Sequence, residues 1–301
     1  MKRIFLFILM NLLVLTLLSV VTHVVLAFFG LTVDQAFGGD WGACLVFAAI
    51  YGFAGSIISL LLSKTMAKAS VGARTITGSE GESERWLVAT VEDLARRANL
   101  KTPEVAIYHG SANAFATGAF RNSALVAVSD EIMGQMSKEE LRAVLGHEMS
   151  HVANGDMVTM SLLQGVLNTF VIFGARLLAQ VVVGLMSNRE GRHSSRSNMG
   201  LYYLVYQVMQ LLLGLLASLV AMGYSRRREY AADAGSANLL GSPSPMIAAL
   251  RRLGNLKPGV LPDSLKAFGI SSAKPRKTSL LATHPALEDR IEALERLMRG
   301  R

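Results

Sequence analysis

The stretch HEMSH at residues 147–151 decides how the rest of the sequence is interpreted. Two histidines four positions apart share one face of a helix, so both imidazole rings can bind a single tetrahedral metal ion. Glu148 lies beside that face, where its carboxylate can take a proton from a water molecule at the metal. The spacing therefore predicts a metal site formed by His147 and His151, with Glu148 as the catalytic base.

Local signals place this stretch on a helix. Ser137 followed by Glu140 is a capping box that starts the helix, and Asn154-Gly155 ends it after Ala153. The apolar face of this helix is supplied by other residues, Leu141, Val144, Leu145 and Val152. Because the histidines are not needed for packing, metal binding is favoured over a purely structural role.

A catalytic zinc ion takes three protein ligands and leaves its fourth position to water. The single cysteine, Cys44, lies in an apolar run, so a histidine or a carboxylate must supply the third ligand. Glu229, which follows the last apolar stretch, is the strongest candidate. Asp233 would share its helical face and could support a ligand histidine. The alternative is that Glu229 neutralises the arginines at residues 226–228 at a solvated helix start.

The composition indicates a membrane protein. Hydrophobic residues form 51% of the chain and charged residues only 17%, against a usual charged share of about a quarter. Four apolar stretches, at residues 4–25, 41–62, 158–186 and 201–224, are long enough to span a bilayer. The net charge is +8, and the basic residues lie mostly beside these stretches. This favours an anionic lipid surface over nucleic acid as a partner.

The positions of the basic residues predict the topology. The first stretch is interpreted as a retained anchor, because it is too long for a signal peptide and no small-residue cleavage site follows. Lys64, Lys68 and Arg74 follow the second stretch, so the N-terminus and the residues after 63 are expected in the cytoplasm. The last two stretches form either two full spans, which their length favours, or a hairpin that enters from the cytoplasmic face. The hairpin remains an alternative because Arg176 would be costly within a span and the arginines of the connecting loop favour the cytoplasmic side.

The remaining segments have ordinary globular composition. Helical periodicity predicts helices at residues 84–98 and 285–299. Short β-like runs at residues 105–108, 112–117 and 124–128 predict a small antiparallel sheet. The expected fold is therefore α+β and mainly α-helical, an integral membrane protein whose zincin-type domain combines the motif helix with this sheet.

The order of the motifs resembles the HtpX family of bacterial membrane zinc metalloproteases, which are related to the prenyl-CAAX endoproteases. The motifs that carry the resemblance are NAFATG at 113–118, HEMSH at 147–151 with NGD at 154–156, REYAAD at 228–233, and HP at 284–285 with RI at 290–291. The resemblance covers nearly the whole chain, and the order and spacing of its motifs make it much more specific than HEMSH alone.

The resemblance implies which residues form the site. It implies one zinc ion per chain held by His147, His151 and Glu229, with Glu148 as general base. Asp233 would then stand behind a ligand histidine. The ligand types alone do not separate zinc from manganese or iron.

Two further assignments also follow from the resemblance. His284 would lie near the substrate and help to stabilise the oxyanion; otherwise it is an ordinary residue at a helix N-terminus. The strand containing Asn113, Ala114 and Phe115 would lie beside the active site, where an edge strand could hold an extended peptide by backbone hydrogen bonds. Without the resemblance these three residues predict only a strand.

The apolar stretches predict a domain organisation, and the resemblance implies a biological setting. A transmembrane hairpin (1–63) would precede the first part of a cytoplasmic protease domain (64–157), and a second hydrophobic helical pair (158–224) would precede its second part (225–301). The expected activity is cleavage of misfolded or damaged membrane proteins at the bacterial inner membrane, in protein quality control and the stress response. Association into a homo-oligomer or with other quality-control proteases is left open.

Three other classes of protein fit the sequence less well. An intramembrane protease of the site-2 type would carry HEMSH on an apolar helix, whereas residues 137–140 are polar and charged. A catalytically silent adaptor with structural zinc would fill all four metal positions with protein ligands, usually cysteines. A metal transporter would place its ligands inside the membrane spans. The sequence therefore favours a catalytic metal site.

Overall fold

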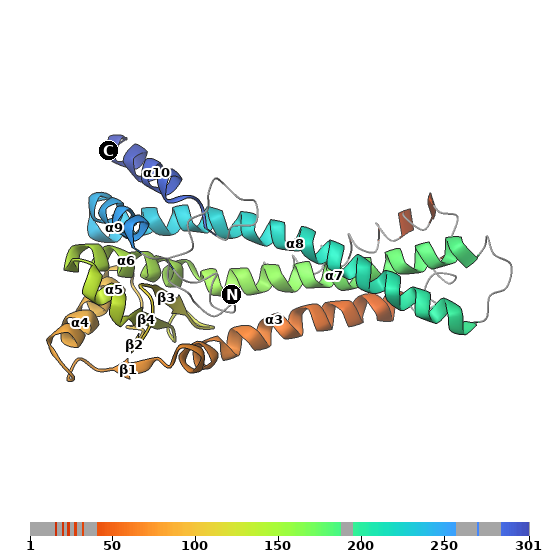
Figure 1. Ribbon diagram of the computed structural model, residues 1–301, viewed down its shortest axis with the longest axis horizontal. Coiled ribbons are helices and arrows are strands. Elements are labelled where there is room, and N and C mark those ends of the chain that lie inside the picture. The colour runs from red at the N-terminus through yellow and green to blue at the C-terminus, as the bar shows by residue number, and fades with distance from the viewer. Residues whose placement is uncertain are drawn as a thin grey trace. The chain divides into compact units, whose positions relative to one another are not determined.

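The computed structural model describes residues 41–187, 195–256, 270 and 284–300, with scattered residues between 16 and 32 (Figure 1). Most of the first apolar stretch lies outside the described residues, so its predicted role as an anchor stays a prediction. The chain divides into two compact units. The first comprises Met1–Ile58 and Ser161–Ala221, and the second comprises Ser59–Met160 and Met222–Arg301.

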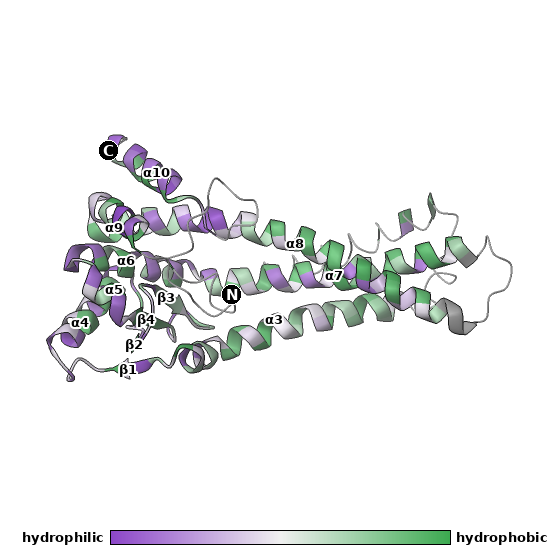
Figure 2. Cartoon of the chain, viewed as in Figure 1, coloured by the Kyte–Doolittle hydropathy of each residue, from purple (hydrophilic) through white to green (hydrophobic). Residues whose placement is uncertain are grey.

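The first unit contains parts of three long helices, α3 (Trp41–Val71), α7 (Asp156–Ser187) and α8 (Ser195–Leu240). Among the described helices, these three are long and apolar enough to cross a membrane. Figure 2 shows the apolar colouring along most of α3 and the middle of α8. Large apolar side chains such as Leu204 and Leu211 are exposed, at 64% and 66%, on a face that lipid would cover.

Small residues let the helices of the first unit pack closely. A Cβ atom at Gly52 would lie 2.5 Å from Thr169 Oγ1, and one at Gly165 would lie 2.4 Å from the Phe53 ring. Close backbone approach at glycine is the usual way in which membrane helices associate. Arg176, the charged residue within α7, lies over the Phe47 ring at 4.5 Å, so it faces protein.

The second unit contains a four-stranded sheet, β1 (Arg74–Ile76), β2 (Glu104–Tyr108), β3 (Ala114–Thr117) and β4 (Leu125–Ser129), in the order β1-β2-β4-β3. The prediction of an antiparallel sheet is wrong for one pair, because β2 and β4 run parallel. Consecutive strands usually pair, but β4 inserts between β2 and β3. All five residues of β4 are buried, as a central strand covered on both faces requires.

Helices cover both faces of this sheet. On one face the side chains of Val105, Ala114, Ala116 and Val126 join the largest core cluster with residues of α4 (Glu82–Arg97) and α6 (Lys138–Asn154). On the other face Phe115, Leu125 and Ala127 pack with Ala67 near the end of α3. The remaining helices of the unit are α5 (Asp130–Gln135), α9 (Ser244–Asn255) and α10 (Leu287–Arg299).

The motif helix α6 begins and ends where the sequence predicts. Ser137 is its N-cap and forms the capping box with Glu140, in which both reciprocal hydrogen bonds are present. Gly155 at the C-terminal end has a φ of 67°, the left-handed conformation that glycine adopts without strain. The chain then turns directly into α7 at Asp156. The predicted mainly helical α+β fold with membrane helices is confirmed, with a mixed sheet in place of the antiparallel one.

Candidate metal centre

Helix α6 carries both motif histidines into the interior of the second unit. His147 and His151 are 1% and 6% exposed, although each carries a polar ring. Their Nε2 atoms lie 3.1 Å apart, as expected for residues one helical turn apart that point at one position. The two rings are almost perpendicular, with an interplanar angle of 89°.

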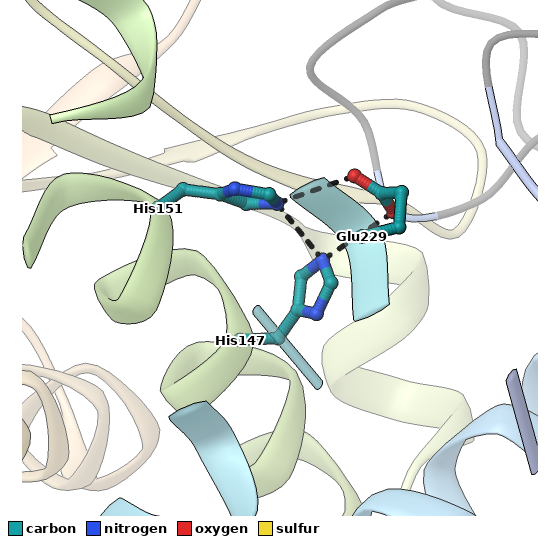
Figure 3. A group of neighbouring side chains, drawn as sticks. All are labelled: His147, His151 and Glu229. Atoms are coloured by element: carbon teal, nitrogen blue, oxygen red, sulfur yellow. Dashed lines mark hydrogen bonds and ion pairs between the residues drawn. The ribbon is translucent and has the colours of Figure 1, made fainter. Parts of the chain in front are cut away.

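Glu229 joins this pair from α8, 78 positions beyond His151 in the chain. Its Oε1 atom lies 3.3 Å from His151 Nε2, and its Oε2 atom lies 3.6 Å from His147 Nε2. Figure 3 shows the three side chains turned toward one another. One ligand atom from each residue lies within 4.8 Å of the other two, and all three residues are buried. The structure therefore brings together the two histidines and the acid that the sequence singled out.

Small residues explain why α8 reaches α6 so closely. A Cβ atom at Gly146 would lie 2.8 Å from Ser236 Oγ, and one at Gly235 would lie 2.5 Å from Ser150 Oγ. The Ser236 hydroxyl also donates a hydrogen bond to the Ala143 carbonyl at 2.8 Å. This close contact between the two helices holds Glu229 and Asp233 opposite the motif face.

A carboxylate holds the second ring nitrogen of each histidine. His147 Nδ1 lies 2.9 Å from Asp233 Oδ1, and His151 Nδ1 lies 2.7 Å from Asp156 Oδ2. Because a carboxylate can only accept, each Nδ1 carries the proton and donates it. Asp233 thus contacts a motif histidine, as the helical spacing predicts. The sequence analysis assigned no role to Asp156.

An arginine contacts each of these two carboxylates. Arg290 of α10 is fully buried and donates to both Asp233 oxygens, at 2.7 and 2.8 Å, and its Nη1 atom lies 3.3 Å from Glu229 Oε2. Arg228 Nε lies 3.2 Å from Asp156 Oδ2. The sequence analysis missed the part played by Arg290. Its signal is a charged residue on the apolar face of an amphipathic helix, one turn after Leu287 and next to Ile291.

The donor set fits a divalent cation. With both Nδ1 atoms protonated, the neutral rings point two Nε2 lone pairs and the Glu229 carboxylate at one place, which is unfavourable unless a cation lies between them. Burial opposes the charge on Glu229, but His284, His151 and Arg290 hold its pKa well below the usual value. Burial opposes a positive charge on His151, but Asp156 and Glu229 raise its pKa to about 9.

Glu148 lies next to this cluster, and its two carboxylate oxygens have different surroundings. Its Oε2 atom accepts a hydrogen bond from the Ala116 N–H of β3 at 2.8 Å, while its Oε1 atom is buried with no hydrogen-bond partner within the described residues. Burial is the largest cause that raises the pKa of Glu148, to about 8, in the absence of a metal. An orphaned buried carboxylate oxygen beside three metal-ligand groups suits a base that acts on a bound water.

The strand predicted to hold substrate, β3, is the edge strand next to β4. Of the three residues singled out there, Phe115 points its side chain to the far face of the sheet, toward Tyr108 and Leu125. Asn113 precedes the strand, and its side-chain oxygen accepts a hydrogen bond from the Ala114 N–H. The Ala114 carbonyl accepts a hydrogen bond from the Ile270 N–H at 3.1 Å. The edge therefore lies beside Glu148, and the Ala114 carbonyl and the N–H groups of Ala114 and Ala116 already have hydrogen-bond partners.

His284 also lies in the cluster. It is 4% exposed, and its Nδ1 atom is 2.9 Å from Glu229 Oε2. It stands two residues before Ala286, the N-cap of α10. The structure brings His284 to the third ligand candidate, and its role toward substrate stays a prediction.

Comparison with known proteins decides the family. Residues 82–298, which include every residue of the metal cluster, match peptidase family M48. The chain belongs to peptidase family M48. Within it, the chain is 50% identical to a protease HtpX homolog of Janthinobacterium sp. (strain Marseille), over 99% of this chain and all of that one. It is 52% identical to a protease HtpX homolog of Neisseria meningitidis serogroup B (strain ATCC BAA-335 / MC58), with the same coverage.

A solved structure shows the same fold at much lower identity. The crystal structure of S. mikatae Ste24p matches with a TM-score of 0.58 and 19% identity, and the match covers 92% of this chain and 67% of Ste24p. Together with the family and the three apolar helices, these findings make the chain a membrane metalloprotease of the HtpX type. The predicted family and enzyme class are confirmed, and the family implies a metal.

Proposed function

We propose that the chain is a zinc endopeptidase that cleaves misfolded or damaged membrane proteins, in protein quality control and the stress response. The observation that carries the proposal is the buried group of His147, His151 and Glu229, with the unpaired Glu148 oxygen beside it. The group supplies three protein ligands of the His2Glu kind, the number that catalytic zinc sites use with water as the fourth ligand, whereas structural sites use four protein ligands.

The residues of the chain then have distinct parts in peptide hydrolysis. A bound zinc ion would polarise the scissile carbonyl and lower the pKa of a water molecule. The Ala116 N–H holds Glu148 Oε2, so Oε1 is the atom that accepts the proton from water and passes it to the leaving amine. His284 would donate to the developing oxyanion, provided that it turns from Glu229.

Edge strand β3 would present the substrate. Its backbone could pair with an extended peptide, which is a common way to hold a scissile bond. The Ile270 N–H now occupies the Ala114 carbonyl, so a bound peptide would replace that hydrogen bond. The hydrogen bond from the Ala116 N–H to Glu148 supports this role for β3, because it fixes the catalytic base relative to the strand.

The site's place along the chain favours substrates at a membrane. The third apolar stretch begins seven residues after His151, and the fourth ends five residues before Glu229. Both ligands are therefore separated from an apolar stretch by only a few residues of the chain. With the basic residues after the second stretch, this favours a site on the cytoplasmic face of a bacterial inner membrane. The transmembrane parts would be residues 1–63 and 158–224, and the protease parts residues 64–157 and 225–301.

A comparison of two variants tests the proposal. The full-length chain, purified in detergent with zinc, is given casein or a membrane-protein substrate. Glu148→Gln should retain zinc and lose cleavage by about 10²–10⁴-fold, since general-base catalysis contributes that much. Glu139→Gln, an exposed glutamate on the same helix, should behave like the wild type. Cleavage by Glu148→Gln at the wild-type rate would overturn the mechanism, and absence of cleavage in both would favour a silent zinc-binding adaptor.

A further inference from the structure

His151 is held from behind by a pair that the proposed catalytic steps do not use. Asp156 accepts the His151 Nδ1–H at 2.7 Å, and Arg228 Nε lies 3.2 Å from the same carboxylate oxygen. The side chains of Asp156 and Arg228 are only 9% and 11% exposed. Arg228 Nη2 is also 3.4 Å from His151 Nδ1. Asp156 thus accepts from the ring nitrogen, and the positively charged Arg228 lies beside both groups, nearly buried.

We propose that Asp156 and Arg228 are a positioning pair that orients His151 for the metal. The carboxylate fixes the proton on Nδ1, so the Nε2 lone pair faces Glu229 and the metal position. The Arg228 guanidinium lies 3.2 Å from the same carboxylate as an ion pair, and it keeps that side chain turned inward against His151. The proposal rests on the proposed function, since it assigns a task toward the same metal.

The positions of the two residues in the fold give the pair a second task. Asp156 is the first residue of α7, directly after the left-handed Gly155 that ends α6. Arg228 immediately precedes Glu229 in α8. The pair therefore joins the end of the motif helix, the start of α7 and the segment of α8 that carries the third ligand. Any shift of α7 against α8 at this point would change the His151 ring and the Glu229 carboxylate together.

Metal affinity and metal geometry test the pair without relying on activity. The full-length chain in detergent is titrated with zinc against a chelator of known affinity, and its cobalt form is examined by visible absorption, which reports ligand geometry. Asp156→Asn keeps the shape of the side chain but removes its charge. It should weaken zinc binding about 10-fold or more, the range usual for groups behind a ligand, and alter the cobalt spectrum. Arg228→Met should have a smaller effect in the same direction, and Arg228→Lys should restore part of the affinity.

The neighbouring exposed Arg227 provides the matched control, because Arg227→Met removes a charge of the same α8 turn without touching Asp156. It should leave zinc affinity and the cobalt spectrum unchanged. Thermal unfolding of the metal-free variants separates positioning from folding: the proposal requires weaker metal binding in Asp156→Asn at an unchanged metal-free melting temperature. Wild-type zinc affinity in Asp156→Asn would overturn the proposal that the pair positions His151. So would a lowered metal-free melting temperature that accounts for the whole loss of zinc affinity. Absence of metal binding in the wild type would instead overturn the proposed function.

Discussion

The two histidines of the metal centre are held in the same way by different parts of the chain. Behind His147 stand Asp233 and Arg290, which are 2% and 0% exposed. Behind His151 stand Asp156 and Arg228, whose side chains are slightly more exposed and joined by one longer contact of 3.2 Å. Arg290 instead donates two hydrogen bonds to Asp233 and also contacts Glu229.

From this difference we infer that the two sides of the centre contribute differently to the stability of the fold and to metal binding. The inner side, His147 with Asp233 and Arg290, is part of the buried interior of the protease unit, so its charges stabilise the fold as well as the metal. The outer side, His151 with Asp156 and Arg228, lies where α7 and α8 leave that unit. We therefore expect inner variants to affect folding and metal binding, and outer variants to affect mainly metal binding.

Removal of the inner arginine should have the largest effect. Arg290→Met leaves the buried carboxylates of Asp233 and Glu229 without their cation. Breaking a buried ion pair from one side costs about 3–5 kcal/mol, so the metal-free variant should unfold at a much lower temperature. Arg296→Met, an exposed change on the same helix, removes only a surface pair with Glu292 and should cost less than about 1 kcal/mol. Equal melting temperatures for the two variants would show that the inner side does not stabilise the fold.

The carboxylates behind the histidines allow a direct comparison of the two sides. Asp233→Asn should weaken zinc binding by roughly 10–100-fold and also lower the metal-free melting temperature, because Arg290 loses its main partner. Asp156→Asn should reach the lower part of that range with little change in melting temperature. Chelator competition and thermal unfolding of both variants supply the two measurements. If the two variants lose the same amount of stability, the two sides contribute equally to the fold.

The contact between α6 and α8 should be sensitive to a single methyl group. Gly235→Ala places a Cβ 2.5 Å from Ser150 Oγ, so the helices must separate or Ser150 must turn. We expect a loss of roughly 1–2 kcal/mol in stability, the usual cost of overpacking, together with weaker zinc binding. Gly134→Ala, where the added Cβ meets nothing within 4 Å, is the control. Wild-type zinc affinity in Gly235→Ala would show that the approach of the two helices does not position Glu229.

Local signals in the sequence account for what could be predicted. The capping box at Ser137 and Gly155 define α6 because a helix end depends on residues within one turn. The HEMSH spacing and the Glu229–Asp233 spacing predict shared faces for the same reason. The apolar stretches that form α3, α7 and α8 follow from composition alone.

The features that the sequence did not reveal depend on contacts between distant segments. The parallel pairing of β2 with β4 follows from the insertion of β4 between β2 and β3, which no strand pattern encodes. Asp156 looks like an ordinary helix-terminal charge, and Arg290 stands out only as a charge on an apolar helix face; neither pattern names a partner until the fold brings both residues to the histidines. The contact of Gly235 with Ser150 likewise appears only when α8 meets α6, so the residues alone offered Glu229 only as a candidate, and the resemblance implied the full ligand set.

The assignment of Glu229 as the third ligand is the central claim, because it joins the two halves of the centre. The most direct measurement is zinc bound per chain in Glu229→Gln, an isosteric variant, beside Glu288→Gln, an exposed glutamate of α10. We expect one tightly bound zinc per chain in the wild type and in Glu288→Gln. In Glu229→Gln we expect a loss of affinity beyond the roughly 10–100-fold usual for groups behind a ligand. One tightly bound zinc per chain in Glu229→Gln, with wild-type affinity, would show that Glu229 is not a ligand.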